Sequence, residues 1–299
     1  MTAGREADGE VPSGVASAPP GGPTTLRILL GARLRRLREQ SGISRHEAGY
    51  SIRSSHSKIS RLELGRSPYK ERDVKDLLTL YGVTDEGQRE ELLRLARQAS
   101  APGWWQRYGD IVPVWSPTYL GMEQAASLIR VYAPQYVPDL LQTEEYARGL
   151  IRLEHPGEPE DVIDRRVALK LERQRALLRG GVRLWALMDE TALMRPVGDR
   201  RSMRAQIDHL LELGAQDDTA IQVLPFGRGH PAASHPFTVL RFAEPDLPDV
   251  VYIEYATNAL YLDKPEDVER YVELMGRLMI EAPGIDAMAD LLRERLTEI

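Results

Sequence analysis

Apolar residues recur at helical spacing near the start of the chain. Leu30, Leu34 and Leu37 stand at i, i+4 and i+7, which forms one stripe of a 3.6-residue period. Gly42 follows at a position where helices commonly end in the left-handed conformation. The pattern therefore predicts an amphipathic helix that ends just before Gly42.

A capping signal marks the start of a second helix. Ser44 and Glu47 have the spacing of a capping box, in which a hydroxyl and a carboxylate each accept an otherwise unpaired backbone N–H. The second helix is expected from about Arg45 to Ser51. A tight turn around Ile52 and Arg53 follows it.

A third helix is predicted directly after this turn, capped by Ser54 or Ser55. Ile59 and Leu62 face the core in such a helix, and the outward positions are polar: His56, Ser57, Ser60 and Arg61. Two short helices joined by a tight turn, the second with hydrogen-bonding side chains, have the geometry that enters the DNA major groove. The segment is therefore interpreted as a helix-turn-helix that reads DNA.

The expected DNA contacts follow from position on the third helix. His56 and Ser57 are placed near base edges, and Arg61 lies one turn further, where a guanidinium can bind guanine O6 and N7. Phosphate contacts are expected from basic residues at helix ends and after the third helix. The complete predicted set is Arg45, Ser55, His56, Ser57, Lys58, Ser60, Arg61 and Arg66.

Charge is distributed unevenly along the chain. The 299 residues carry a formal net charge of -6, yet residues 26–72 carry +8 and the residues after them carry -12. A basic segment in an otherwise acidic chain is consistent with a DNA-binding domain joined to a domain that repels DNA. A solvated basic face on an ordinary helical bundle is the alternative, and it leaves the capping box, turn and spacing unexplained.

The run Ser57-Lys-Ile-Ser-Arg-Leu-Glu63, followed by Gly65-Arg66, resembles the signature of phage-repressor-type (XRE family) helix-turn-helix domains. The resemblance implies an all-α, lambda-repressor-like domain of five helices, in which the second and third helices form the reading unit. It also implies a structural ion pair between Arg38 and Glu63. The turn position that is commonly Gly holds Arg53, for which a left-handed conformation is costly.

The length of the chain predicts a second, larger domain. A helix is expected from Ser116 to about Val131 and a long charged helix over 158–179. Strands are predicted at 182–188, 219–224, 237–242 and 250–256, with 259–262 as a possible fifth. This pattern predicts an α+β domain with a small, mostly antiparallel sheet. The expected divisions are a disordered tail (1–25), a DNA-binding domain (26–98), a packed linker (99–118) and an effector or partner-binding domain (119–299).

The second domain also resembles a known family, the effector domain of actinomycete WhiJ-type regulators. The stretches that carry the resemblance are 134–148, 193–198, 221–226 and 250–254 (PQYVPDLLQTEEYAR, LMRPVG, IQVLPF and VVYIE). It implies a transcriptional regulator that is described as antitoxin-like and is often encoded beside a small acidic protein. The family pattern usually has Gly where Asp139 stands, so a different turn is expected there.

Few residues in the sequence suggest a site that binds or reacts with a small molecule. The chain contains no Cys, which excludes disulfides and Cys-based zinc sites. Trp104, Trp105, Trp115 and Tyr136 form the best candidate for a ligand or partner pocket, although ordinary core packing is the favoured alternative.

The remaining polar groups give no strong sign of a reaction. His230 and His235 have no adjacent third metal ligand. Asp189-Glu190 is interpreted as a solvated or ion-paired acidic pair rather than an acid–base pair, and no Gly-rich phosphate loop is present. We therefore expect no metal, no cofactor and no enzymatic activity.

These observations predict a sequence-specific transcriptional regulator that binds a two-fold site in double-stranded DNA as a homodimer. The N-terminal residues lack the apolar block of a signal peptide, and no apolar run is long enough to span a bilayer. A cytoplasmic, nucleoid-associated protein is therefore expected. The alternative is an antitoxin-like protein that mainly holds a small acidic partner, with DNA binding serving autoregulation.

Overall fold

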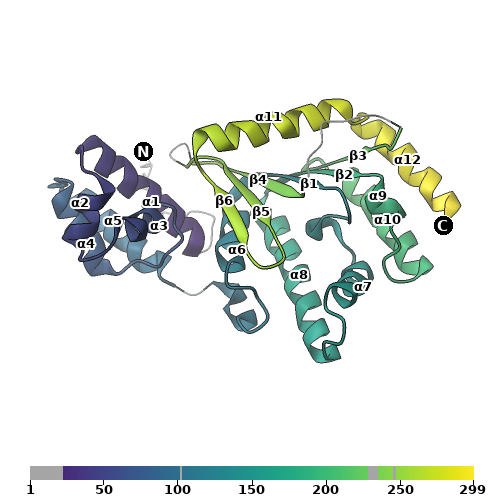
Figure 1. The fold of residues 1–299 in the computed structure, drawn as a ribbon, viewed down its shortest axis with the longest axis horizontal. Helices are drawn as coiled ribbons and strands as arrows, with labels where there is room; N and C mark the ends of the chain where they lie inside the picture. Colours follow the sequence, from purple (N-terminus) through teal and green to yellow (C-terminus); the bar gives the residue numbers. More distant parts are fainter. Residues whose placement is uncertain (1–22, 102, 228–234, 245–246) are drawn as a thin grey trace, which may run out of the picture.

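The computed structural model describes residues 23–101, 103–227, 235–244 and 247–299. A group of helices at the N-terminal end lies beside a larger part in which helices cover both faces of a sheet (Figure 1). The sequence prediction of an all-α N-terminal domain and a C-terminal α+β domain is confirmed.

Five helices form the N-terminal region. They are α1 (Pro23–Gln40), α2 (Arg45–Ser51), α3 (His56–Glu63), α4 (Glu71–Leu80) and α5 (Glu86–Ala99). Helix α1 begins at Pro23, so the last three residues of the predicted tail are helical. The rest of that tail lies outside the described residues.

The predicted caps of α2 and α3 are present. Ser44 N donates to Glu47 Oε2 at 2.8 Å, and Glu47 N donates to Ser44 Oγ at 3.2 Å, which completes the capping box. Ser55 rather than Ser54 caps α3, where its hydroxyl accepts from Lys58 N at 3.2 Å. These bonds fix where each of the two short helices begins.

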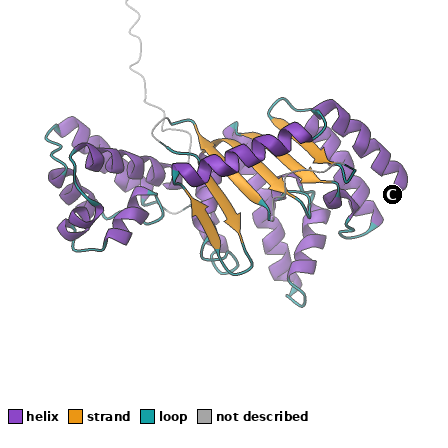
Figure 2. Cartoon of the chain, turned by 45° about the horizontal axis from the view of Figure 1, so that its top comes forward, coloured by secondary structure: helices purple, strands orange, loops and turns teal. Residues whose placement is uncertain are grey.

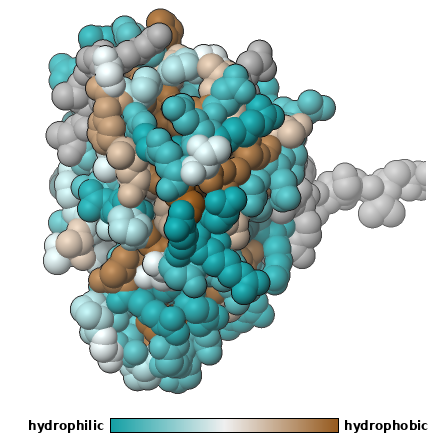
Figure 3. Space-filling model, turned by 90° about the vertical axis from the view of Figure 1, so that its right-hand side faces the viewer, coloured by the Kyte–Doolittle hydropathy of each residue, from teal (hydrophilic) through white to brown (hydrophobic). Residues whose placement is uncertain are grey.

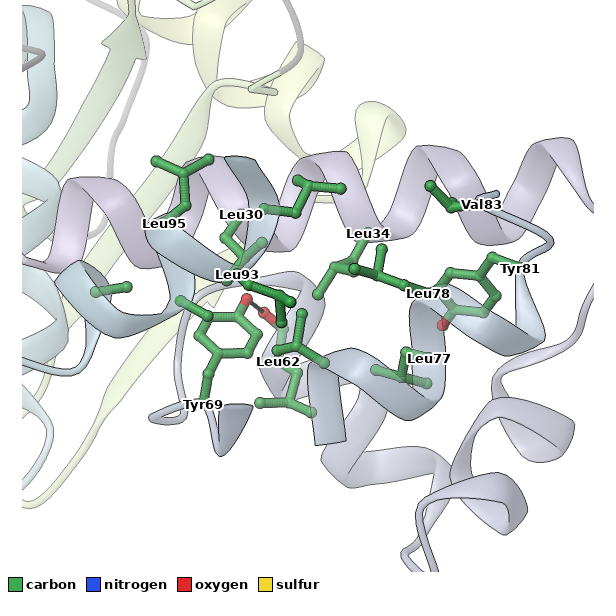
Figure 4. Close-up of a cluster of buried hydrophobic side chains, with 14 of the residues drawn as sticks. Leu30, Leu34, Leu62, Tyr69, Leu77, Leu78, Tyr81, Val83, Leu93 and Leu95 are labelled. Carbon is green, nitrogen blue, oxygen red and sulfur yellow. Dashed lines mark hydrogen bonds between the residues drawn. The ribbon is translucent and has the colours of Figure 1, made fainter. Parts of the chain in front are cut away.

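One apolar core holds the five helices together (Figure 4). Leu30 and Leu34 of α1 meet Leu62 of α3 and side chains of α4 and α5 in this cluster. The Tyr69 hydroxyl donates to the Leu62 carbonyl oxygen, so the loop after α3 is tied to the end of that helix. Helix α3 is therefore held by both its buried face and its C-terminal end.

The C-terminal part is built on a mixed sheet. Its six strands within the described ranges are β1 (Ala126–Ala133), β2 (Arg183–Asp189), β3 (Thr219–Leu224), β4 (Phe237–Phe242), β5 (Val250–Glu254) and β6 (Ala259–Leu262). Their order is β3-β2-β1-β4-β5-β6. The β1–β2 and β2–β3 pairs are parallel, and the other three pairs are antiparallel.

The prediction of a helix from Ser116 to about Val131 is wrong in its second half, where the chain forms strand β1. The helix expected to reach about Val131 ends as α6 (Ser116–Ala125), and the chain then becomes extended. Met122, Ala126 and Ile129 have helical spacing, but β1 lies at the centre of the sheet and buries Ile129 on one face and Tyr132 on the other. A strand buried on both faces lacks the polar alternation that identifies a strand in a sequence.

Helices cover both faces of the sheet. Helix α11 (Pro265–Glu281) crosses one face, where Met275 and Leu278 pack on Tyr132 and Leu187 (Figures 1 and 2). The other face is covered by α6 and by α7 (Glu144–Glu154), α8 (Glu160–Gly180) and α10 (Arg200–Gly214). The remaining elements are η1 (Trp104–Tyr108), η2 (Asp139–Leu141), α9 (Thr191–Met194) and α12 (Ile285–Glu298).

The surface at the α10 and α12 end is mainly hydrophilic and is crossed by a band of hydrophobic side chains (Figure 3). None of the helices within the described ranges is long and apolar enough to cross a membrane.

The two parts of the molecule touch through α1 and α6. The backbones approach closely there, because a Cβ added at Gly121 of α6 would overlap the side chain of Thr24 in α1. Helix α1 therefore contributes Ile28 and Ala32 to a core cluster that includes Met122 of α6 and Leu240 of β4. The helix that supports α3 is thus also part of the C-terminal packing.

Candidate nucleic-acid interface

Helix α3 has one buried face and one polar exposed face, as the sequence predicts. Ile59 and Leu62 are 1% and 2% exposed, which anchors the helix in the core. Ser55, His56, Ser57 and Arg61 are exposed, and Ser60 is half-buried. The exposed side chains can hydrogen-bond to bases, as recognition helices require.

The turn before α3 is held in an unusual conformation. Arg53 has φ +54°, and it is the sole non-glycine residue with positive φ in the part of the chain that the structure describes. The left-handed conformation at this position, commonly a glycine in the resembled family, is thus adopted by an arginine. Gly49 of α2 allows this turn to lie close, because a Cβ added there would stand 2.9 Å from the Ser54 carbonyl oxygen.

A buried ion pair joins α1 to α3. Arg38 Nε donates to Glu63 Oε1 at 2.5 Å and Arg38 Nη2 to Glu63 Oε2 at 3.2 Å, and the two side chains are 8% and 2% exposed. Burial by itself lowers the pKa of Arg38, but the hydrogen bond and charge of Glu63 raise that pKa above its ordinary value. Arg38 also donates to the Ile43 carbonyl oxygen, so it fixes the loop before α2 as well.

Two of the predicted phosphate contacts are engaged within the protein. Arg45 Nε donates to Glu63 Oε2 at 2.9 Å, so Arg45 is a second partner of the buried carboxylate. Lys58 Nζ donates to Asp73 Oδ2 of α4 at 2.8 Å. Arg45 keeps 39% of its side chain exposed and Lys58 keeps 27%, so either could exchange its partner for a phosphate.

Arg66, also a predicted phosphate contact, is engaged with the C-terminal domain. Arg66 Nη2 donates to the Tyr261 carbonyl oxygen of β6 at 3.0 Å, and its guanidinium lies 4.7 Å from the centre of the Tyr261 ring. Burial against the C-terminal domain lowers the pKa of Arg66. The sequence could not show this, since the partner lies 195 positions further along the chain.

Two exposed residues beside α3 escaped the sequence prediction. Tyr50 is 83% exposed, and Arg53 is also exposed. They line a shallow hollow with Ser51, Ser54 and Ser55, immediately before the reading face. The available signal was their place beside α3, since Tyr50 stands near the end of α2 and Arg53 in the turn that follows.

The four candidate pocket aromatics do not gather around one cavity. Trp104 and Trp105 pack edge to face with ring centroids 5.7 Å apart, in a cluster with Tyr108 and Leu120. Trp115 instead donates to Glu254 Oε1 at 3.0 Å. Tyr136 lines the cavity of the C-terminal domain, whereas Trp104 and Trp105 pack in the cluster between η1, α6 and α8.

Both residues of the acidic pair at the end of β2, Asp189 and Glu190, have hydrogen-bond partners within the protein. Asp189 accepts from the Tyr132 hydroxyl at 3.1 Å, and Glu190 accepts from Phe226 N at 3.0 Å and pairs with Arg295. His230 lies outside the described residues. Within the described ranges there is no group of three side chains with metal-ligating spacing.

Comparison with known families agrees with this division of the chain. Residues 29–92 match the family described as a helix-turn-helix domain, which suggests DNA binding. Residues 116–294 match the domain of unknown function DUF5753. Neither the curated proteins nor the solved structures that were searched contain a match to the chain.

The fold and the two matches define a helix-turn-helix protein with a C-terminal α+β domain. The chain belongs to the DUF5753 family, whose match spans more than half of its length.

Proposed function

We propose that this protein is a sequence-specific transcriptional regulator of the XRE type. The single observation that carries the proposal is the exposed polar face of α3 on a helix whose other face is fully buried and whose last residue, Glu63, is clamped by Arg38. A rigidly held recognition helix places its side chains at fixed distances from base edges.

The charge distribution supports the division of roles. The net charge of +8 over residues 26–72 favours phosphate binding, which supplies affinity that falls steeply with salt. Sequence preference rests on the reading face, chiefly His56, Ser57 and Arg61. The acidic remainder disfavours binding of DNA elsewhere on the molecule.

Dimerisation on a two-fold site is part of the proposal, because helix-turn-helix proteins commonly read two half-sites one helical turn apart. Light scattering on the purified protein, alone and with DNA, tests it. A dimer mass in the complex supports the proposal, and one protomer per site contradicts it.

The finer assignment as a WhiJ-type, antitoxin-like regulator rests on the stretches 134–148 and 250–254, both inside the DUF5753 match. We also propose a cytoplasmic location and a non-enzymatic role. Burial alone raises the pKa of Glu190, but Phe226 N and Arg295 hold that pKa below its ordinary value. Glu190 is therefore a poor general acid near neutral pH, which supports the second point.

Selection of bound sequences from a random DNA library tests the regulator proposal. The wild-type protein is expected to enrich a motif with two related halves. A variant with Ser57→Ala and Arg61→Ala should lose that enrichment, while Arg201→Ala, which removes an exposed cation of α10, should retain it. Enrichment of the same motif by all three proteins would contradict a reading role for α3.

A further inference from the structure

The C-terminal domain contains a cavity of about 480 Å³ on the sheet face that α6, α7 and α8 cover. Strands β1, β4 and β5 form its roof, and α7, α8 and the segments around residues 111–116 and 134–142 form its walls. Many of its apolar lining residues are aliphatic, including Ile129, Val131, Leu150, Ile151 and Leu169. This volume is in the range of sites that hold small organic molecules.

The basic side chains of the cavity wall are already neutralised. Arg173 donates to Glu123 Oε1 at 2.8 Å and to Asp139 Oδ2 at 3.0 Å. Lys170 donates to Asp139 Oδ1 at 2.9 Å, and Arg166 forms two bonds of 2.7 Å with Glu158. Among the lining residues that the structure describes, every Arg and Lys is thus paired, and the pKa of His155 is lowered by burial, so an anionic ligand finds no free cation there.

Two acidic residues of the lining lack such compensation. Glu154 ends α7 and Glu254 ends β5, and both are exposed at the cavity mouth. Neither forms an ion pair with another residue that the structure describes, and Glu254 accepts from Trp115 Nε1 at 3.0 Å. Burial raises the pKa of Glu154, Lys170 and Arg166 oppose that rise, and the negative charges of Asp139 and Glu254 add to it. A positive charge close to both Glu154 and Glu254 would therefore be stabilised.

The interior of the cavity offers aromatic faces and one unpaired hydroxyl. The rings of Tyr119 and Tyr252 stack with centroids 4.0 Å apart. Tyr252 is 5% exposed, and its hydroxyl makes no hydrogen bond of good geometry in the described part of the chain, although the Glu254 carboxylate lies near enough to help raise its pKa. Burial raises the pKa of Tyr252, so the group stays a neutral phenol. A buried hydroxyl without a partner is unfavourable and marks a place where a ligand can complete the bonding.

We propose that this cavity binds a protonated organic amine that carries an apolar body. The ammonium group lies between Glu154 and Glu254, and the apolar body enters along the tyrosine rings and the aliphatic wall. The charge-assisted hydrogen bonds to the carboxylates and the burial of the apolar body select for this class. A carboxylate ligand of the same shape meets two like charges at the mouth.

Probes that share a body and differ in charge test the proposal on the full-length protein. Tryptamine, phenethylamine and hexylamine are compared by calorimetry and thermal shift with the alcohol and the carboxylic acid of each skeleton. At least one amine is expected to bind and raise the melting temperature, with its alcohol and acid at least tenfold weaker. Failure of all three amines, or equal binding of an amine and its acid, overturns the proposal.

Variants locate the binding. Glu154→Gln and Glu254→Gln should each weaken the bound amine about tenfold, the effect of losing one charge-assisted hydrogen bond. Glu145→Gln removes a carboxylate from the first turn of the same helix α7 and should leave binding unchanged. Retained affinity in the double variant Glu154→Gln/Glu254→Gln would show that the amine binds elsewhere and would overturn the proposal.

Tyr252→Phe separates a ligand role from a structural one. The free variant should melt at or above the wild-type temperature, because the unpartnered hydroxyl is removed without loss of ring packing. Its affinity for the amine should fall. Unchanged affinity would contradict the placement of the ligand against Tyr252.

Discussion

The guanidinium of Arg66 lies 4.7 Å from the centre of the Tyr261 ring and donates to the Tyr261 carbonyl oxygen at 3.0 Å. Arg66 follows the recognition helix α3, and Tyr261 belongs to β6 of the C-terminal domain. The Tyr261 ring in turn lies 5.1 Å from that of Tyr252, which lines the cavity of the C-terminal domain. A continuous set of contacts therefore joins the helix-turn-helix region to the cavity.

A double-mutant cycle tests the Arg66–Tyr261 contact. Arg66→Ala and Tyr261→Leu should each lower the free energy of unfolding, and the double variant should lose less than their sum, with a coupling of about 0.5–2 kcal/mol from the cation–π contact. Urea unfolding of the full-length proteins provides the four values. Additive losses would show that the two residues stabilise the protein independently.

Removal of the Arg38 side chain should be strongly destabilising. Arg38→Ala leaves Glu63, whose side chain is 2% exposed, with Arg45 as its remaining cation, and breaking a buried pair costs about 3–5 kcal/mol. The paired replacement Arg38→Met/Glu63→Leu should cost less, since no buried charge is left uncompensated. Urea unfolding distinguishes the two, and equal losses would argue against the ion pair as the source of stability.

The turn before α3 should become more stable with glycine. Arg53 has φ +54°, which costs a non-glycine residue about 1–2 kcal/mol, partly offset by the greater chain entropy of glycine when unfolded. Arg53→Gly should therefore raise the free energy of unfolding by about 0.5–1 kcal/mol.

Gly42 offers the matched control for that prediction. It has φ +69° with open space around its Cα, so Gly42→Ala should lower the free energy of unfolding by about 1 kcal/mol through backbone strain alone. A lower free energy of unfolding for Arg53→Gly would contradict the prediction. It would show that contacts of the Arg53 side chain stabilise the protein by more than the backbone strain destabilises it.

Stability should depend on the charge of Asp139 at acid pH. Burial alone raises the pKa of Asp139, but Lys170 and Arg173 hold it well below the ordinary value of 3.8. The stabilising contribution is therefore present above about pH 4–5 and is lost as the pH falls through the lower folded-state pKa. The difference in stability between wild type and Asp139→Asn should be largest near neutral pH and shrink below pH 4.

Urea unfolding between pH 2.5 and 7 measures this difference. Asp208→Asn on α10, where the side chain is exposed, is the control and should differ from wild type by a constant amount. A constant difference for Asp139→Asn as well would contradict the role of Lys170 and Arg173. The network also explains why a side chain occupies position 139, where the resembled family usually has Gly: the described backbone has no positive φ there, and Asp139 accepts bonds from α8.

The local sequence was sufficient to predict the helical domain. The capping box at Ser44 and a serine cap before α3 depend on residues a few positions apart, and both are present. The sequence left the conformation at Arg53 open, and the structure shows it to be left-handed. The inward positions of α3 followed from helical spacing alone, as did their exposed counterparts.

Features that depend on distant segments could not be predicted in the same way. Strand β1 is buried on both faces, so it carried no alternating pattern, and its parallel pairing with β2 depends on residues more than 50 positions away. Arg66 had the sequence context of a phosphate contact, and only the position of β6 shows that it packs on Tyr261. The cavity collects side chains from segments between residues 111 and 254, for which no single motif exists.

Specificity should depend on Arg61 and affinity on several cations. If Arg61 binds a guanine, Arg61→Ala should weaken binding to the cognate site by about 1–3 kcal/mol and relax the preference at one base pair. Binding to scrambled DNA should change far less. Equal weakening on both DNAs would assign Arg61 to phosphate contact instead.

Fluorescence anisotropy of the full-length protein on DNA from upstream of its own gene, against a scrambled duplex across a salt series, tests the central claim most directly. A sequence-specific regulator should bind the upstream DNA at least tenfold more tightly, with an affinity that falls steeply as salt increases. Binding of both duplexes with the same weak affinity at every salt concentration would contradict the claim that this protein reads DNA sequence through α3.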